Sequence, residues 1–377
     1  MSEMRPTTTD YVPAILFLLA SGLLLPFFFL LSSRGSTSSQ IAVQISALVM
    51  LTIVVSLICG TVVHDIRFYA YGIAIMGVAL RAASVILLPV SSDVLALSAK
   101  GAALILSGQN PYQVLVSTTT KFAYPPLEPL FYIPFLGLDL RWAEFASSSV
   151  IVLVLLYTSL RSLNPRFSLL YLALYCFSPL VAGFVGISTN DTSASLFPFL
   201  AMWIIMFSSA RRRFDYAGVL LGMGVAFKQF GIFPLIFVIG FLIKRNGPWV
   251  RTIVLASLTI ALVSLPFLFW NPRDFLYEVI SFHLAERIAS PYYVLVALNP
   301  QFLGPWLLAL QLSLTASLGA FLLWRIRNWS ECQIAWTSVL LLSLFLGRYF
   351  APSYFAYIMP FWILGGMGLL KRNRQNV

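Results

Sequence analysis

Long apolar runs separated by short polar segments follow one another along the whole chain. Twelve of them are long enough, or nearly long enough, to cross the hydrocarbon core of a bilayer, which takes roughly 17–25 residues. They lie at about 11–31, 41–62, 69–90, 142–160, 168–188, 193–210, 216–227, 230–243, 252–269, 303–323, 333–349 and 354–370. The pattern predicts an all-α polytopic membrane protein, built as a bundle of about twelve transmembrane helices.

The composition supports this prediction. Hydrophobic residues make up 59% of the 377 positions and charged residues only 10%, whereas a soluble domain carries about 25% charged residues. No segment is polar enough to form a separate soluble domain. We therefore interpret 1–377 as a single transmembrane domain, with three spans in 1–90, an extracytoplasmic loop in 91–141 and the remaining spans in 142–377. The first apolar run is expected to be retained as a helix, because no small-residue cleavage site is evident near it.

The charges at the ends of the runs predict an orientation. Lys and Arg concentrate in the cytoplasmic loops of membrane proteins. If the N-terminus is inside, 15 of the 24 basic residues lie on the cytoplasmic side. These are Arg5, Arg67, Arg161, Arg166, Arg211, Arg212, Arg213, Lys244, Arg245, Arg251, Arg325, Arg327, Lys371, Arg372 and Arg374. Of the 13 acidic residues, 8 then lie outside. We expect a multi-pass protein of the plasma membrane with both termini in the cytoplasm.

One apolar segment, 125–138, is not counted as a crossing. It is short, and counting it would move the basic residues after the next span to the outside. It also contains four prolines, Pro125, Pro126, Pro129 and Pro134. Irregular backbone of this kind is tolerated in a membrane where protein covers it or where it lines a wet cavity. We expect a re-entrant or interfacial segment.

The stretch between the third span and this segment opens with an acid, Asp93. From 92 to 107 the pattern predicts a helix lying along the membrane surface, with a serine as its cap and Asp93 in its first turn, where the helix dipole favours a carboxylate. Asp93, Lys100 and Ser107 are spaced seven apart and share one face. Gly108 is expected to end the helix.

A carboxylate beside a spanning helix is costly unless it pairs, faces water or takes part in chemistry. Asp93 is therefore a candidate catalytic residue. The alternative is an interfacial helix whose acid is simply solvated.

Two further segments on the predicted outer face carry candidate site residues. Asn190 and Asp191 join two spans and offer an amide and a second carboxylate. As alternatives, Asn190-Asp191-Thr192 fits a glycosylation sequon, and Asp191 could cap a helix. Lys228 lies at the tip of a short apolar hairpin, where a cation needs an anionic partner or water. A lipid phosphate would suit it, and extension of the side chain to the membrane surface is the alternative.

Three more outer residues could bind an anion. Arg273 and His283 lie in the loop after the ninth span, and Arg348 lies at the outer end of the eleventh. For each of them an ordinary surface position is the competing interpretation. Together with Lys228 they could stabilise the charge that develops when a phosphate leaves. An acceptor hydroxyl would need a general base, and Asp93 is the candidate. This set of groups suits the transfer of a lipid-linked phosphosugar.

Several segments between residues 91 and 275 resemble the GT-C superfamily of glycosyltransferases, most of all its polyprenyl-phosphate-mannose-dependent mannosyltransferases. They are Asp93 before an interfacial helix, Gly108-x-Asn110-Pro111-Tyr112, Tyr124-Pro125-Pro126-Leu127, Ser178-Pro179 with Ser188-Thr189-Asn190-Asp191, Lys228-Gln229-Phe230-Gly231-Ile232-Phe233-Pro234, and Pro266-Phe267 with Trp270-Asn271-Pro272. Their order and spacing carry the resemblance.

The resemblance implies a GT-C-type bundle that uses a polyprenyl-phosphate sugar on the extracytoplasmic face. It assigns the catalytic acid to Asp93 and places Lys228 on the outer face. The positions two residues either side of Asp93 are not acidic, so the single-acid branch is favoured and no metal is expected. Three spans precede Asp93, where the family usually has one. Substrate contacts are expected from Lys100, Asn110, Tyr112, Tyr124, Asn190 and Asp191.

The sequence thus predicts an inverting glycosyltransferase that moves a hexose, with mannose expected, from a polyprenyl-phosphate donor to a lipid or glycan acceptor. The expected partners are these substrates and membrane lipids. No cofactor is expected, and nucleic acid is excluded because the net charge of +11 is scattered over helix ends. A transporter or flippase of an anionic lipid-linked substrate is the alternative, although no paired halves are evident. A catalytically inactive scaffold is a third possibility.

Overall fold

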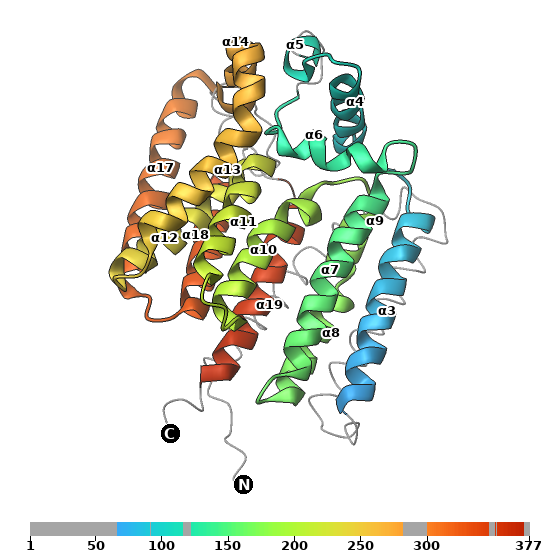
Figure 1. Ribbon diagram of the computed structural model, residues 1–377, viewed down its shortest axis with the longest axis vertical. Coiled ribbons are helices and arrows are strands. Elements are labelled where there is room, and N and C mark those ends of the chain that lie inside the picture. The colour runs from blue at the N-terminus through green and yellow to red at the C-terminus, as the bar shows by residue number, and fades with distance from the viewer. Residues whose placement is uncertain are drawn as a thin grey trace. The chain divides into compact units, whose positions relative to one another are not determined.

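The computed structural model describes residues 66–90, 92–115, 122–281, 300–346, 351 and 353–372. The regular elements of these residues are all helical (Figure 1). The predicted spans at 11–31 and 41–62 lie outside these residues. Within them, five stretches are long and apolar enough to cross a membrane, namely Arg67–Leu87, Arg141–Leu160, Phe167–Gly186, Trp249–Trp270 and Trp329–Leu346. Shorter apolar helices accompany them. The chain is therefore an integral membrane protein by its helices, and the total of about twelve spans stays a prediction.

Every predicted span within the described residues coincides with helix. These helices are α3 (Ile66–Leu87), α7 (Arg141–Leu160), α8 (Pro165–Cys176) with α9 (Pro179–Gly186), α10 (Asp191–Phe207), α11 (Arg213–Phe227), α12 (Ile232–Lys244), α13 (Trp249–Trp270), α17 (Pro300–Arg325), α18 (Trp329–Leu346) and α19 (Tyr354–Arg372). Segment 125–138 forms only α6 (Leu127–Tyr132) and one 3-10 turn (Ile133–Phe135). At about 1.5 Å per residue this segment is too short to cross as a helix.

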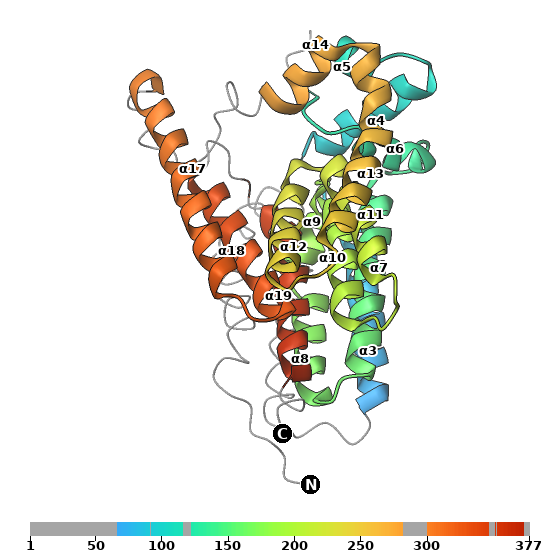
Figure 2. The same cartoon turned by 60° about the vertical axis from the view of Figure 1, so that its left-hand side comes forward.

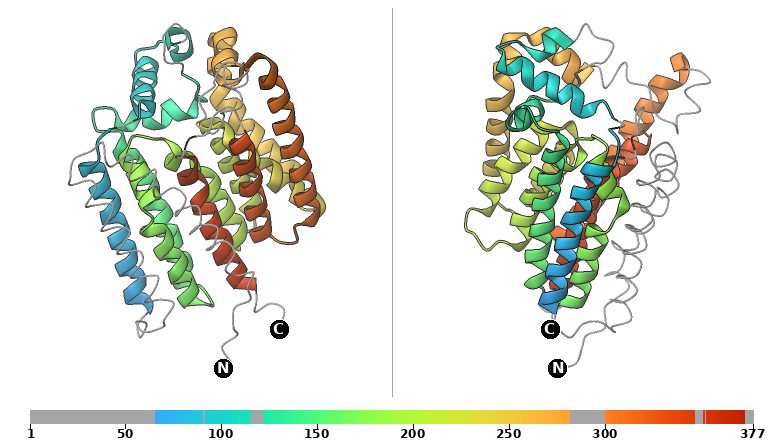
Figure 3. Two further views of the ribbon diagram at one scale, coloured as in Figure 1. Left: turned by 180° about the vertical axis from the view of Figure 1, so that it is seen from behind. Right: turned by 90° about the vertical axis from the view of Figure 1, so that its right-hand side faces the viewer.

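The chain divides into two compact units. The first consists of Met1–Asp93, Arg141–Phe199 and Phe355–Val377, and the second of Val94–Leu140 and Leu200–Tyr354. In the first unit α3, α7 and α8 pack against one another, seen as the blue and green helices in Figure 3. In the second unit α11 packs along α13 (Figure 2).

A buried arginine holds the first unit together where one predicted span is interrupted. The run 168–188 is two helices, because Pro179 has no N–H to donate to the carbonyl of Tyr175. Arg81 of α3 supplies the missing donors. Its Nη2 donates to the Tyr175 carbonyl at 2.9 Å and its Nη1 to the Cys176 carbonyl at 2.8 Å. The guanidinium also lies 4.9 Å from the centre of the Tyr175 ring. Arg81 is fully buried and is satisfied by these groups.

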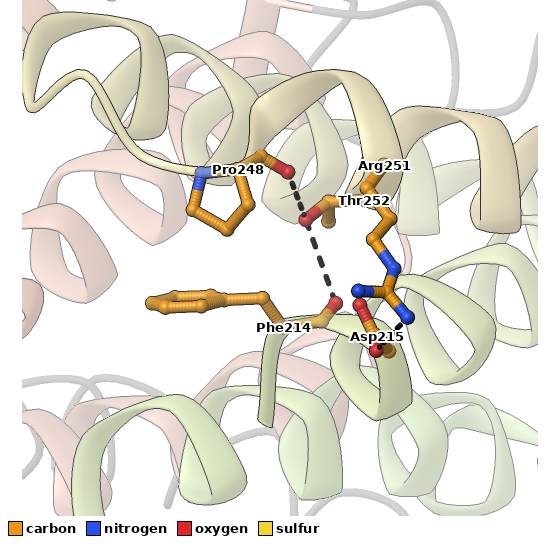
Figure 4. A network of polar contacts seen from close by, with 5 residues as sticks. All are labelled: Phe214, Asp215, Pro248, Arg251 and Thr252. Carbon is orange, nitrogen blue, oxygen red and sulfur yellow. Dashed lines mark hydrogen bonds and ion pairs between the residues drawn. The ribbon is translucent and has the colours of Figure 1, made fainter. Parts of the chain in front are cut away.

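In the second unit, contacts between helix ends bring basic residues of several helices together. Figure 4 shows the starts of α11 and α13 joined by an ion pair between Asp215 and Arg251 at 2.8 Å, beside Thr252, which donates to the carbonyl of Pro248 at 3.0 Å. Lys244, at the end of α12, donates to the carbonyl of Ile326 at 2.7 Å. The basic clusters of this unit therefore gather at one end of its helices, as the charge pattern predicts.

The role of Arg81 can be tested by the change Arg81→Leu. Two buried carbonyl groups would lose their donors, and each unsatisfied group costs about 1–3 kcal/mol. We expect a clear fall in the thermal unfolding temperature of the purified protein in detergent. Arg67→Leu is the control, because Arg67 lies on the same helix and is exposed. Equal destabilisation by the two changes would contradict this account.

Candidate active site

The helix predicted at 92–107 is present as α4 (Val94–Leu106). Asp93 directly precedes it rather than lying in its first turn, and both Asp93 and Lys100 are exposed. Gly108 ends the helix with a positive φ of 73°. Its N–H donates to the carbonyl of Ile105 at 3.0 Å, and the next N–H, of Gln109, donates to Leu104 at 2.9 Å. This is the glycine-ended helix stop that the sequence predicts. The orientation of α4 in the membrane stays a prediction.

Asn110 organises the next turn of the loop. It is 3% exposed and precedes the short helix α5 (Pro111–Leu115). Its side-chain oxygen accepts a hydrogen bond from the backbone N–H of Tyr112 at 3.0 Å. Asn110 is thus the cap of α5, with proline at the first helical position, where the missing N–H costs nothing.

Tyr112 anchors this loop to the rest of the second unit. Its ring is fully buried, and its hydroxyl donates to the carbonyl of Tyr124 at 2.8 Å. The ring centre lies 5.8 Å from that of Phe267 at the end of α13 and 5.0 Å from that of Phe275 in α14 (Pro272–Leu276). Figure 2 shows α5 beside α14. Buried aromatic packing therefore fixes the loop onto a segment more than a hundred residues later.

Two buried acids lie near this tyrosine. Ser98 of α4 donates a short hydrogen bond to Glu128 of α6. Glu278 lies on a π-helical turn, Tyr277–Ser281, and both glutamates are fully buried. Burial raises the pKa of Tyr112 well above its usual value, and the negative charges of Glu128 and Glu278 raise it further. The phenol therefore stays protonated and continues to donate its hydrogen bond.

The tip of the α11–α12 hairpin meets the same loop. Gln229 directly follows Lys228 and donates through its side-chain amide to the carbonyls of Ala123, at 3.0 Å, and Val279, at 3.1 Å. One side chain thus ties the loop before α6 to the π-helical turn. Within the second unit, the Lys228-Gln229 segment is thus hydrogen-bonded to the loop.

Lys228 is held between aromatic rings. Its Nζ lies 5.3 Å from the ring centres of both Phe230 and Tyr354, and these two rings meet edge to face. The residue is 6% exposed. A side chain extended to the membrane surface would be exposed, so this alternative is wrong. Cation–π contacts of this kind are worth about 0.5–2 kcal/mol.

Asn190 and Asp191 belong to the first unit and open α10. They are 1% and 2% exposed. Burial of Asn190 argues against the glycosylation alternative, because an attached glycan needs the surface. Asp191 is the first residue of the helix, one position after the cap that the alternative interpretation assigned to it. Contact of either residue with substrate stays a prediction.

The remaining predicted anion-binding residues are Arg273, His283 and Arg348. Arg273 lies on α14 and is exposed. His283 and Arg348 lie outside the described residues. Among the described residues, no group of three or more His, Cys, Asp and Glu is arranged to hold a metal ion. Cys176 and Cys332 are buried free thiols, as expected of packing residues, and Cys59 lies outside the described part.

Residues 134–270 match the family described as dolichyl-phosphate-mannose-protein mannosyltransferase. This part of the chain is similar to that family. The match contains Lys228 and Gln229 and begins after Asp93. No curated protein matches the sequence.

The fold is similar to that of ArnT from Cupriavidus metallidurans in its crystal structure bound to undecaprenyl phosphate. The TM-score is 0.51 at 17% identity, over 80% of this chain and 59% of that one. ArnT in the apo state matches with a TM-score of 0.46 at 15% identity, over 76% and 56%. The chain thus spans less than two thirds of the length of ArnT. The resemblance to polyprenyl-phosphate-sugar-dependent glycosyltransferases is confirmed at the level of family similarity and fold.

Several residues that fix the loops and turns of the two units were not predicted from the sequence as site residues. They are Glu128, Gln229 and Glu278 in the second unit, and Arg141 and Glu144 in the first. A signal was present for four of them. They are ionisable residues in or beside apolar segments, and such residues need partners. Gln229 carries no charge and offered no such signal.

The bridge made by Gln229 can be tested with Gln229→Met, which keeps the length of the side chain and removes the amide. We expect faster hydrogen–deuterium exchange in residues 122–128 and 277–281, because two carbonyls lose their shared donor. Gln311→Met is the matched control, because the Gln311 amide donates to the carbonyl of Ser343 at 2.8 Å, between α17 and α18. Unchanged exchange in Gln229→Met would show that the bridge does not hold the loop.

Proposed function

We propose that the protein is an inverting membrane glycosyltransferase, which transfers a hexose, with mannose expected, from a polyprenyl-phosphate donor to a lipid or glycan acceptor on the extracytoplasmic face. The observation that carries the proposal is the match of residues 134–270 to a mannosyltransferase family. The likeness of the fold to that of ArnT, solved with undecaprenyl phosphate, supports it. The proposed location is the plasma membrane, with both termini in the cytoplasm.

Asp93 is proposed as the general base. It is exposed at the start of α4, so an acceptor hydroxyl could approach its carboxylate. The acceptor oxygen forms a bond to the anomeric carbon while the bond from that carbon to the phosphate oxygen breaks. The bonding electrons leave with polyprenyl phosphate, and the hydroxyl proton passes to Asp93. A single displacement of this kind inverts the anomeric centre.

Lys228 is proposed to bind the donor phosphate, with Arg273, His283 and Arg348 as further phosphate ligands. The aromatic rings of Phe230 and Tyr354 stabilise the charge of Lys228. A charge-assisted hydrogen bond between the ammonium group and a phosphate oxygen would add to these contacts. The lysine would then stabilise the charge that develops on departure.

The other predicted contacts divide by exposure. Lys100 is exposed on α4 and is proposed to contact substrate directly. Asn110, Tyr112 and Tyr124 are buried in the loop. Their proposed contribution is to shape the surface that substrate meets, since the Asn110 side-chain oxygen and the Tyr112 hydroxyl already make hydrogen bonds within the loop. Asn190 and Asp191 are proposed to contact the sugar or the acceptor.

The change Asp93→Asn tests the base. It is nearly isosteric at an exposed helix start, so the fold should be kept while turnover falls by roughly 10²–10⁴, the usual worth of general acid–base catalysis. Turnover is measured with purified protein, labelled polyprenyl-phosphate hexoses and native lipids. Asp139→Asn is the matched control, because Asp139 is an exposed acid in the same predicted loop. Near-normal turnover in Asp93→Asn would remove the residue from the mechanism. Transbilayer movement of donor without sugar transfer would favour a flippase instead.

The change Lys228→Ala tests the phosphate role. Loss of a charge-assisted contact should weaken donor binding by at least about tenfold, and acceptor binding much less. Lys228→Arg should keep part of the affinity because the charge survives, although the donor geometry differs. Tyr354→Phe keeps the ring and should behave like the wild type. Unchanged donor affinity in Lys228→Ala, measured with a labelled donor, would reject the role.

A further inference from the structure

Arg141 of the first unit joins the ends of two helices. It is the first residue of α7. Its Nη1 donates to the carbonyl of Leu88 at 2.7 Å, just after the end of α3, and to the carbonyl of Gly186 at 2.9 Å, the last residue of α9. The chain runs from Leu88 to Asp93 and from Gly186 to Asn190. One guanidinium group therefore hydrogen-bonds the residues at which both segments begin, and each segment leads to proposed site residues.

The physical basis of this contact is the shortage of donors at helix ends. The last carbonyls of a helix have no partner within it, and the negative end of the helix dipole favours a cation there. A guanidinium is planar and presents several donors in a fixed arrangement, so one arginine can serve two helix ends. A lysine offers a single, more flexible ammonium group in the same place.

Glu144 lies one helical turn after Arg141 in α7. It fixes the other end of the segment that joins α9 to α10. Its side chain is fully buried, and its carboxylate accepts a hydrogen bond from the backbone N–H of Ser193 at 3.1 Å. Ser193 lies in the first turn of α10, where the helix dipole favours a negative charge. The hydroxyls of Ser147 and Ser193 are also 2.9 Å apart. Both ends of the turn 187–190 are thus hydrogen-bonded to α7.

The turn itself has little freedom. Ser188 has a positive φ of 74°, which is uncommon for a residue with a side chain. Thr189 donates through its hydroxyl to the carbonyl of Phe184 at 3.0 Å. At Gly186 an added Cβ would lie 2.5 Å from the carbonyl oxygen of Ser84, so α9 and α3 approach as closely as a glycine permits. The hydrogen bonds of Arg141 add to these constraints on the turn.

We propose that Arg141 is a positioning residue of the reaction, which sets the place of Asp93 relative to Asn190 and Asp191. The inference rests on the proposed function, because it treats Asp93 as the base and the Asn190 turn as a substrate contact. Arg141 need not touch substrate. Its effect arises because a misplacement of about 1 Å in a reacting group can cost roughly a hundredfold in rate.

The experiment compares Arg141→Met and Arg141→Lys with the wild type in purified, detergent-solubilised protein. In Arg141→Met we expect faster hydrogen–deuterium exchange in the segments leading to Asp93 and to Asn190. We also expect kcat to fall by roughly 10–100-fold, with the donor KM changed by less than about threefold. Arg141→Lys should recover part of both, because one donor and the charge remain. Arg161→Met is the matched control, since Arg161 follows the far end of α7 and is exposed.

Several outcomes would overturn the inference. Unchanged exchange in Arg141→Met would show that the guanidinium does not hold these segments. Faster exchange with normal kcat would show that their position does not matter for transfer. If Arg141→Met does not fold, Arg141→Lys decides, and a wild-type kcat together with faster exchange in these segments would count against positioning. Failure of the proposed function appears separately, as absence of transfer by the wild type itself.

Discussion

The structure depends on one constraint: backbone carbonyls left without partners where helices break or end in apolar surroundings must find donors elsewhere. In this chain the donors are side chains from distant parts of the sequence. Arg81 serves the break after α8, Arg141 serves the ends of α3 and α9, and Gln229 serves the loop at Ala123 and the turn at Val279. Each contact fixes an irregular segment by hydrogen bonds to its backbone, so the position of the segment follows from the packing of helices rather than from its own sequence.

Arg81 and Lys228 are buried cations that are stabilised by different kinds of group. The guanidinium of Arg81 donates to carbonyls at Gly77, Tyr175 and Cys176, so it completes the backbone hydrogen bonding of the first unit. The ammonium of Lys228 lies against the rings of Phe230 and Tyr354, and such cation–π contacts help to stabilise a buried charge.

The loop between α3 and α7 shows how a polar segment can be made rigid. Several of its hydrogen-bonding groups are used locally: Gly108 ends α4, Asn110 caps α5, and Tyr112 donates to the Tyr124 carbonyl. Its aromatic side chains pack onto Phe267 and Phe275. Fixed in this way, the loop can present exposed side chains such as Lys100 in a defined arrangement. Preorganisation of this kind is what the proposed transfer between two substrates would need.

The sequence by itself determined the positions of the helices and of their ends, because apolar periodicity, proline and glycine act within a few residues. It located α4 and its stop at Gly108, and it placed the basic ends of α11, α12 and α13 together. The prediction of one span at 168–188 followed the continuous hydropathy and left out the break that Pro179 signals. The donors that satisfy this break come from Arg81, far away in the chain. The sequence could not show that Gln229 reaches Ala123, or that Arg141 joins Leu88 to Gly186. Only tertiary packing decides such contacts, since a hydrogen bond requires two groups to meet within about 3 Å, and no local pattern encodes that distance.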